Sequence, residues 1–169
     1  MGLVENKNTA SAIGATLLGE PMTTVVIPTF NRPKLLKQAI DSALNQTVPC
    51  RVMVVAHGSD STTRAVVRRF GTRVEYVRGE TDYGPIFAWL EGALRTTTPF
   101  LKLLFDDDWM DPSFVEKTQA LMTDDVGFAV CQAKVVQLDT GRTVSTMFRY
   151  PGAATGIFRI SSKMGKQIE

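Results

Sequence analysis

The sequence is poor in the residues that build metal clusters and covalent scaffolds. Its 169 residues include two cysteines and one histidine. Cys50 and Cys131 do not form a CxxC pair, which argues against a zinc site or a disulfide framework and favours a reducing compartment. No apolar stretch reaches the roughly 18 residues that a transmembrane helix needs. The first 20 residues carry Glu5 early and lack a basic flank, so a secretory signal is not expected.

A strong charge of either sign is also missing. The chain has 19 Lys and Arg against 17 Asp and Glu, a net charge of +2. The basic residues are scattered, with no dense run and no interleaved aromatic residues, which argues against a nucleic-acid partner. With 44% apolar and 21% charged residues, the composition is typical of a globular domain that buries a core. We expect a cytoplasmic protein, with peripheral attachment to a membrane left open.

Short β-branched runs alternate with stretches of helical periodicity from residue 23 onward. Strands are predicted at 24–27, 52–55, 74–77 and 100–105, and helices at 35–44, 65–70, 84–95 and 114–122. Asn31 is expected to cap the first helix, with Pro33 in its first turn. This alternation predicts an α/β fold, Rossmann-like and doubly wound, with a mostly parallel sheet.

The end of the sequence has a different pattern. Strands are predicted at 126–131, 133–138 and 143–148, with a hairpin turn at 139–142. We interpret residues 1–22 as an N-terminal arm and residues 23–169 as one domain.

Ligands of open α/β sheets bind just beyond the carboxyl ends of the strands. Three adjacent acids, Asp106, Asp107 and Asp108, follow the fourth predicted strand. They would raise one another's pKa unless a cation or hydrogen-bond donors compensate, and Mg²⁺ or Mn²⁺ would do so. The structural alternative is a helix N-terminus, with Asp108 or Asp111 as the capping residue ahead of Pro112. The sequence leaves both readings open.

Three strand-end motifs agree in order and spacing with one enzyme family. The runs VVIPTFNRPKLLKQAIDSALNQT, VVAHGSDS and LLFDDDWMDPSF resemble the nucleotide-sugar-binding half of inverting GT-A glycosyltransferases, the large family 2 type that includes cellulose-, chitin- and hyaluronan-synthase-like and capsule enzymes. The resemblance covers about residues 23–122. It implies a domain that holds a nucleoside-diphosphate sugar and a divalent cation, Mn²⁺ or Mg²⁺. It also implies sugar transfer, with inversion, to the hydroxyl of a glycan, lipid-linked or small-molecule acceptor, and leaves homo-oligomerisation open.

The same resemblance assigns roles to individual residues. Asp107 and Asp108 would bind the metal, Asp106 would lie near the ribose, and Phe30 would pack on the base unless it is a core residue. Arg78 would flank the nucleotide, unless it is a solvated surface charge. The expected nucleotide-sugar-binding residues are Pro28, Thr29, Phe30, Asn31, His57, Arg78, Gly84 and Asp106.

The sequence departs from the family pattern after the second predicted strand. Ala56-His57 stands where the family usually has a pair of acids, which puts a uridine preference in doubt. His57 can make one hydrogen bond to a base edge, but it cannot supply a carboxylate's charge. The alternative is an ordinary surface histidine on a turn.

The second departure concerns length. Only 61 residues follow Asp108 (169 − 108), whereas the family uses a longer C-terminal half for the acceptor site and general base. We therefore expect the acceptor part to be short or truncated. Asp139 is the only acid between Asp125 and Glu169, and is a weak candidate for the base.

Glycosyl transfer has alternatives. The main alternative is a non-catalytic nucleotide-sugar-binding or interaction module. A phospho-receiver fits poorly, because its acids would follow the first strand, where this chain has Pro28-Thr29-Phe30. A nucleotidyl transferase would be expected to show a Gly-rich, basic phosphate loop, and none is found.

Overall fold

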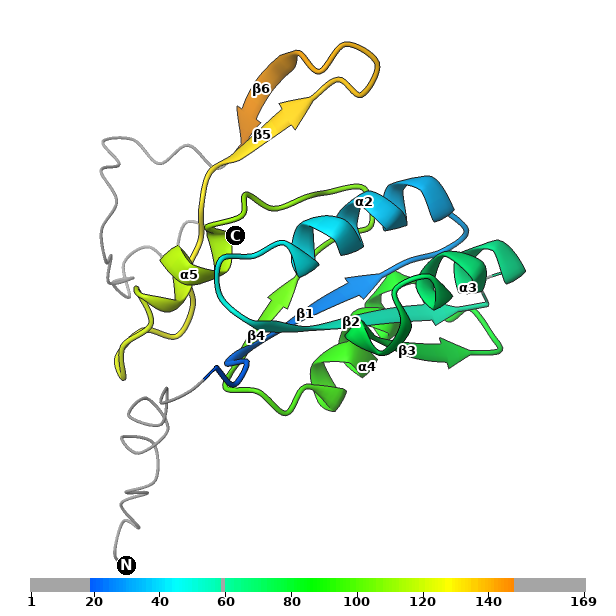
Figure 1. The fold of residues 1–169 in the computed structure, drawn as a ribbon, viewed down its shortest axis with the longest axis horizontal. Coiled ribbons are helices and arrows are strands. Elements are labelled where there is room, and N and C mark those ends of the chain that lie inside the picture. The colour runs from blue at the N-terminus through cyan, green and yellow to red at the C-terminus, as the bar shows by residue number, and fades with distance from the viewer. Residues whose placement is uncertain (1–18, 59, 148–169) are drawn as a thin grey trace, which may run out of the picture. The chain divides into compact units, whose positions relative to one another are not determined.

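The computed structural model describes residues 19–58 and 60–147. Contacts divide the chain into two units, Met1–Gln119 and Ala120–Glu169. The first unit is built on a four-stranded, wholly parallel sheet in the order β3-β2-β1-β4 (Figure 1). Its strands are β1 (Thr23–Pro28), β2 (Cys50–His57), β3 (Val74–Gly79) and β4 (Phe100–Leu103).

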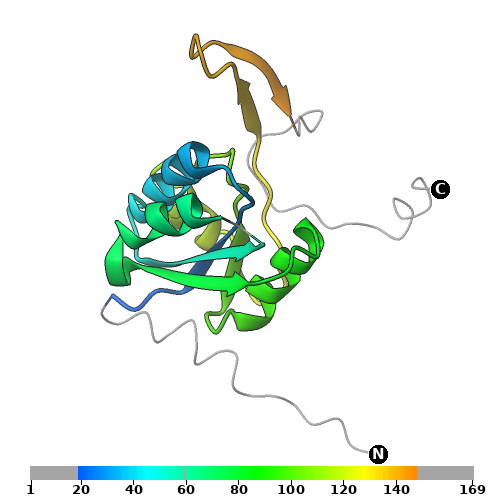
Figure 2. The same cartoon turned by 90° about the vertical axis from the view of Figure 1, so that its right-hand side faces the viewer.

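Helices cover both faces of this sheet. On one face lie α2 (Pro33–Leu44) and α3 (Ser61–Arg68), and on the other lies α4 (Pro85–Arg95), as Figures 1 and 2 show. Because β1 is sandwiched between the two layers, all six of its residues are buried. Parallel sheets with crossover helices bury both faces, which explains the continuous β-branched run of β1. The predicted α/β, doubly wound fold is confirmed.

Alternate side chains of β1 supply the two cores. Val25 and Ile27 point to the α2 side, where they belong to one apolar cluster with Leu36 and Ile40. Val26 points to the opposite side, in a cluster that includes Ala88 of α4. Both cores depend on the period of two along the strand.

Two side chains fix the loops that precede α2 and α3. Asp60 caps α3 as its oxygen Oδ1 accepts hydrogen bonds from the backbone N–H groups of Thr62 and Thr63. Asn31 was expected to cap α2, but this prediction is wrong. Arg32 is the N-cap residue, whereas Asn31 has a left-handed backbone (φ 54°) and its Oδ1 accepts from the backbone N–H of Asp60 at 2.8 Å. The Asn31 side chain therefore ties the loop after β1 to the loop after β2.

Two short helical elements complete the first unit. A 3-10 turn, η1 (Gly71–Arg73), leads into β3, and α5 (Phe114–Gln119) ends the unit. The helix predicted at 114–122 stops at Gln119, ahead of a turn closed by the Val126 N–H on the Thr123 carbonyl. No helix in the described part of the chain is long and apolar enough to cross a membrane.

The second unit contains an antiparallel pair of strands, β5 (Ala133–Val136) and β6 (Thr143–Met147). The predicted hairpin is confirmed, with its turn around Asp139. The strand predicted at 126–131 is wrong, since these residues have no regular structure. Phe128 and Val130 are exposed there, and no strand within residues 19–58 and 60–147 pairs with this segment. A segment of strand-forming residues without a ladder partner does not form a strand.

Candidate functional site

The strand order places a topological switch point between β1 and β4. From β1 the chain builds β2 and β3 on one side, and then crosses to add β4 on the other. In open α/β sheets, ligands bind in the crevice beyond the carboxyl ends of the strands at such a point. The loops that meet here are 29–32 after β1 and 104–108 after β4. They carry six of the ten residues that the sequence analysis assigned to binding, and Pro28 ends β1 beside them.

A buried hydrogen bond joins these two loops. The hydroxyl Oγ1 of Thr29 donates to Oδ2 of Asp106 at 2.7 Å, and both residues are less than 10% exposed. The backbone supports the same contact, since Leu104 N–H donates to the Val26 carbonyl at 2.9 Å. A buried carboxylate is costly unless its oxygens are paired, so this bond fixes the relative position of the two loops.

Arg32 adds a positive charge to the acidic loop, which is the loop 104–108 with its three adjacent acids. Its Nη1 lies 3.3 Å from Oδ1 of Asp106 and 3.1 Å from Oδ2 of Asp107. Arg32 was not among the predicted site residues, although three adjacent acids require a cation or hydrogen-bond donors to offset their repulsion. Its place directly after the first predicted strand, in the loop between β1 and α2, was the sequence signal that could have identified Arg32 as a site residue.

Asp108 is the third acid of this loop, and its surroundings disfavour its ionised form. Its pKa is raised, first by desolvation and then by the Asp107 carboxylate, with a smaller contribution from Asp106, while Lys102 lowers it. Desolvation and the charges of the neighbouring carboxylates therefore both disfavour the ionised form of Asp108.

The sequence offered a helix cap, by Asp108 or Asp111, as the alternative to a metal site. In the structure Asp111 makes the bonds of such a cap. Asp111 Oδ1 accepts hydrogen bonds from the backbone N–H and hydroxyl of Ser113, in the turn before α5, and these bonds lower its pKa. Since Asp111 makes these bonds, Asp107 and Asp108 are not needed to begin α5.

The donor set of the acidic loop decides whether it can hold a metal ion. In the described part of the chain, no three His, Cys, Asp or Glu side chains converge as a preformed site. Asp107 and Asp108 nevertheless present exposed carboxylates at the switch point. Mg²⁺ and Mn²⁺ use one or two carboxylates and fill their other positions with water or substrate phosphate. The two carboxylates fit such a cation.

His57 is a buried residue at the end of β2. Its side chain is 9% exposed, and its Nε2 lies 2.5 Å from Oε2 of Glu91 on α4. Glu91 Oε1 in turn accepts from Arg95, and the bonds from His57 and then Arg95 lower the pKa of Glu91. Imidazole Nδ1 is buried without a hydrogen-bond partner among the described residues. The surface-histidine alternative is wrong, and a role for His57 in base binding stays a prediction.

The remaining predicted residues lie at the same edge of the sheet. Phe30 is 49% exposed, so the core alternative for this residue is wrong. Arg78 is exposed on β3, in register with Ala56 of β2. Gly84 begins α4 with φ 87°, a conformation that favours glycine, and its N–H donates to Asp82 Oδ1 at 2.7 Å. Among residues 19–58 and 60–147, no hydrogen bond or ion pair joins Arg78 or Gly84 to the acidic loop.

The weak candidate for the general base belongs to the second unit. Asp139 is exposed in the hairpin turn, and Oδ2 accepts a long hydrogen bond of 3.4 Å from Gln137. Glu169 lies outside the described residues. The base therefore stays unassigned.

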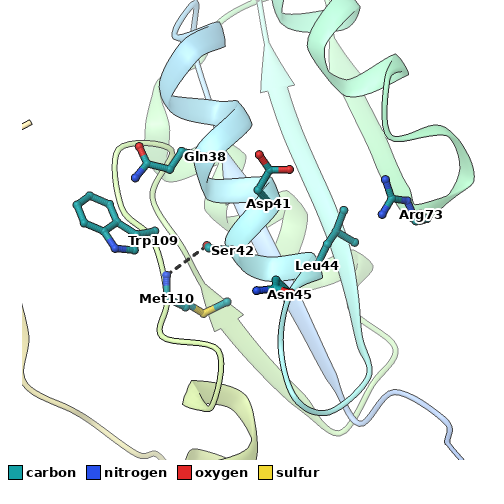
Figure 3. A pocket seen from close by; sticks show the side chains of 8 residues that line it. All are labelled: Gln38, Asp41, Ser42, Leu44, Asn45, Arg73, Trp109 and Met110. Carbon is teal, nitrogen blue, oxygen red and sulfur yellow. Dashed lines mark hydrogen bonds between the residues drawn. The ribbon is translucent and has the colours of Figure 1, made fainter.

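An open pocket of about 510 Å³ lies beside α2 (Figure 3). Trp109, which directly follows the acidic loop, stands at one end of it, and the Met110 N–H donates to Ser42 Oγ at 3.2 Å within it. None of the predicted site residues lines this pocket. Its lining residues are Gln38, Asp41, Ser42, Leu44, Asn45, Arg73, Trp109 and Met110.

Comparison with protein families gives one match that covers most of the chain. The model of glycosyl transferase family 2 matches residues 24–166. Among curated proteins, validoxylamine A glucosyltransferase of Streptomyces hygroscopicus subsp. jinggangensis is 33% identical over 106 residues, covering 59% of this chain and 25% of the relative. The 4,4'-diaponeurosporenoate glycosyltransferase of Staphylococcus aureus is 33% identical over 78 residues, covering 44% of this chain and 21% of the relative. The chain thus spans about a quarter of the length of the curated relatives it matches.

Solved structures agree on the fold. S. aureus TarS 1-349, in complex with UDP, has a TM-score of 0.55 at 21% identity, with 58% of this chain and 31% of that chain covered. The mannosyltransferase PcManGT from Pyrobaculum calidifontis, in complex with GDP-Man and Mn²⁺, has a TM-score of 0.58 at 21% identity, with 70% and 36% covered. At this identity the likeness shows a shared GT-A fold.

Proposed function

Because this chain belongs to glycosyl transferase family 2, we propose that it binds a nucleoside-diphosphate sugar and serves in the inverting transfer of that sugar to an acceptor hydroxyl. The observation that carries the proposal is the buried Thr29–Asp106 hydrogen bond across the switch point. This bond holds the loops after β1 and β4 together. One edge of the sheet therefore carries an aromatic ring, a guanidinium and two exposed carboxylates, which belong to Phe30, Arg32, Asp107 and Asp108. These groups match the base, the phosphates and the metal of such a donor.

The donor would lie across the ends of the parallel strands. Phe30 presents a half-exposed ring on which a base can pack, beside Pro28 and Asn31. Asp106 would lie near the ribose, while its bond to Thr29 keeps the carboxylate in place. On the β2–β3 side, His57, Arg78 and Gly84 would flank the nucleotide.

Asp107 and Asp108 would hold the divalent cation, Mn²⁺ or Mg²⁺. A cation bound there would stabilise the negative charge that develops on the departing diphosphate. The structural neighbour PcManGT was solved with Mn²⁺ and GDP-Man, and TarS with UDP, which supports a search among these ligands. Desolvation and the neighbouring Asp107 carboxylate raise the pKa of Asp108, so a cation bound there would also stabilise its ionised form.

Sugar transfer requires more than donor binding. A general base must reach the acceptor hydroxyl within hydrogen-bond distance, and it contributes roughly 10²- to 10⁴-fold in rate. We propose a glycan, a lipid-linked molecule or a small molecule as the acceptor, and keep Asp139 as a weak candidate for the base. The alternative function, a non-catalytic nucleotide-sugar-binding module, predicts donor binding without transfer.

The test is a thermal-shift panel of UDP, GDP and their sugars, each with MnCl₂ and with EDTA. A ligand that binds the folded state raises the melting temperature by mass action. We expect stabilisation by one nucleotide class in Mn²⁺ and its loss in EDTA. No stabilisation by any nucleotide would contradict the proposal. A product assay with the stabilising sugar nucleotide then separates a transferase from a binding module.

A further inference from the structure

One cation at the switch point contacts two of the three acids. Arg32 Nη1 lies within 3.3 Å of Asp106 Oδ1 and 3.1 Å of Asp107 Oδ2. Asp106 is buried and already accepts a hydrogen bond from Thr29, whereas the Asp107 side chain is 52% exposed. The guanidinium therefore holds one fixed acid and one accessible acid.

The contact with Asp107 can be exchanged at little cost. The Arg32 and Asp107 side chains are each about half exposed, and exposed ion pairs contribute only about 0.2 to 1 kcal/mol. A divalent cation carries twice the charge of a guanidinium and binds carboxylate oxygen directly. Since a divalent cation held by Asp107 would use the same carboxylate as Arg32, the two cations would compete for it.

A displaced Arg32 would remain beside the place where phosphates are expected. It is the N-cap residue of α2, and no side chain of the described residues caps this helix. The first N–H groups of a helix attract anions, and a guanidinium pairs with phosphate through parallel hydrogen bonds. Phosphate would thus find a guanidinium released from Asp107 beside a helix N-terminus that has no side-chain cap.

We propose that Arg32 is a positioning residue with two successive partners: it pairs with Asp107 in the free protein, and turns to the diphosphate of the nucleotide once a divalent cation occupies Asp107. This inference rests on the proposed function, which it deepens by giving Arg32 opposite effects on two ligands. Removing Arg32 strengthens metal binding and weakens nucleotide binding. A purely structural role would weaken both or neither.

The test uses the whole chain and calorimetric titrations of Arg32→Gln against the unaltered protein. The first probe is MnCl₂ alone, for which we expect about threefold to fivefold tighter binding in R32Q, the factor that corresponds to an exposed ion pair. The second probe is UDP or GDP at saturating Mn²⁺, for which we expect about fivefold to tenfold weaker binding, because a charge-assisted hydrogen bond to phosphate is lost.

Two further variants serve as controls. Arg32→Lys keeps a competing charge, so its Mn²⁺ affinity should stay within about twofold of the unaltered protein, while nucleotide binding is restored only in part. Arg68→Gln removes an exposed charge from α3, away from the acidic loop, and should change neither affinity. A gain in Mn²⁺ affinity of the same size in R68Q would overturn the inference, since general charge would explain it.

The outcomes separate this inference from the proposed function. If the unaltered chain binds Mn²⁺ and nucleotide but R32Q binds both equally well, only the role of Arg32 is overturned. If Mn²⁺ binding is seen only in R32Q, competition by Arg32 is supported directly. If neither protein binds Mn²⁺ or nucleotide, both the proposed function and the inference are overturned.

Discussion

The Thr29 hydroxyl donates a 2.7 Å hydrogen bond to Asp106, 77 residues away in the chain, and both side chains are more than nine-tenths buried. Thr29→Val keeps the shape of the side chain and removes the donor. The buried carboxylate then loses a partner, and we expect the free energy of unfolding to fall by about 1 to 3 kcal/mol. Thr29→Ser retains the hydroxyl and should lose less. Urea denaturation of the three proteins measures the difference, and equal midpoints for T29V and T29S would contradict the importance of this bond.

Asp107 is expected to matter for binding and little for folding. Asp107→Asn keeps the shape of an exposed side chain but removes the charge that would hold a divalent cation. Nucleotide binding in Mn²⁺, measured by calorimetry, should weaken about tenfold or more, and EDTA should abolish it in the unaltered chain. The control is Asp111→Ala, which removes the oxygen that accepts both hydrogen bonds from Ser113 before α5 and should lower the melting temperature without changing binding per folded molecule. The reverse pattern would favour a structural role for Asp107.

The His57–Glu91–Arg95 chain predicts a pH dependence of stability. The pKa of Glu91 is lowered in the folded protein by hydrogen bonds from His57 and Arg95. A group with a lowered folded pKa contributes stability above its unfolded pKa, and this contribution is lost as the pH falls through the folded value. Glu91→Gln should therefore destabilise the protein at pH 7, and the difference from the unaltered chain should shrink toward pH 3. Unfolding free energies at pH 7, 5 and 3 check this, and a constant difference would exclude the linkage.

The sheet and the acidic loop were predictable because their causes are local. The β-branched runs of β1 and β2 and the three adjacent acids after β4 can be read without knowing what contacts them. Thr29 follows β1 and Asp106 follows β4. Because these strands are parallel, both residues lie at the same edge of the sheet, as the fold alone predicts.

What the sequence did not predict depends on partners far along the chain. Asn31 has a capping residue's chemistry, but its oxygen bonds to Asp60, 29 residues away, which leaves Arg32 as the N-cap. Glu91 pairs with His57, 34 residues away in the chain, and the hydrophobic periodicity of a single sequence does not predict such a contact. The segment 126–131 has strand-forming residues without a partner strand in the described part of the chain.

Gly92 marks the closest approach of α4 to the sheet. A Cβ atom at this position would lie 2.2 Å from Cγ1 of Val26, and 3.3 Å from its Cβ and Cγ2. Val26 is fully buried at the centre of β1, so it cannot turn away without displacing its neighbours. Gly92→Ala would gain up to about 1 kcal/mol from helix propensity, but the overpacked contact costs about 1 to 3 kcal/mol. Because three Val26 atoms lie too close, we expect the clash to dominate and the free energy of unfolding to fall.

A double-mutant cycle shows whether the clash is the cause. Val26→Ala removes both methyl groups that face Gly92, and alone it should destabilise the protein by leaving a cavity. In the V26A/G92A protein the new methyl group occupies part of that cavity, so the two effects should not add. We expect a favourable coupling of about 1 kcal/mol or more, measured by urea denaturation of the four proteins. Strict additivity would mean that Gly92→Ala acts through the helix backbone, and that the close packing of α4 on β1 is not what requires glycine here.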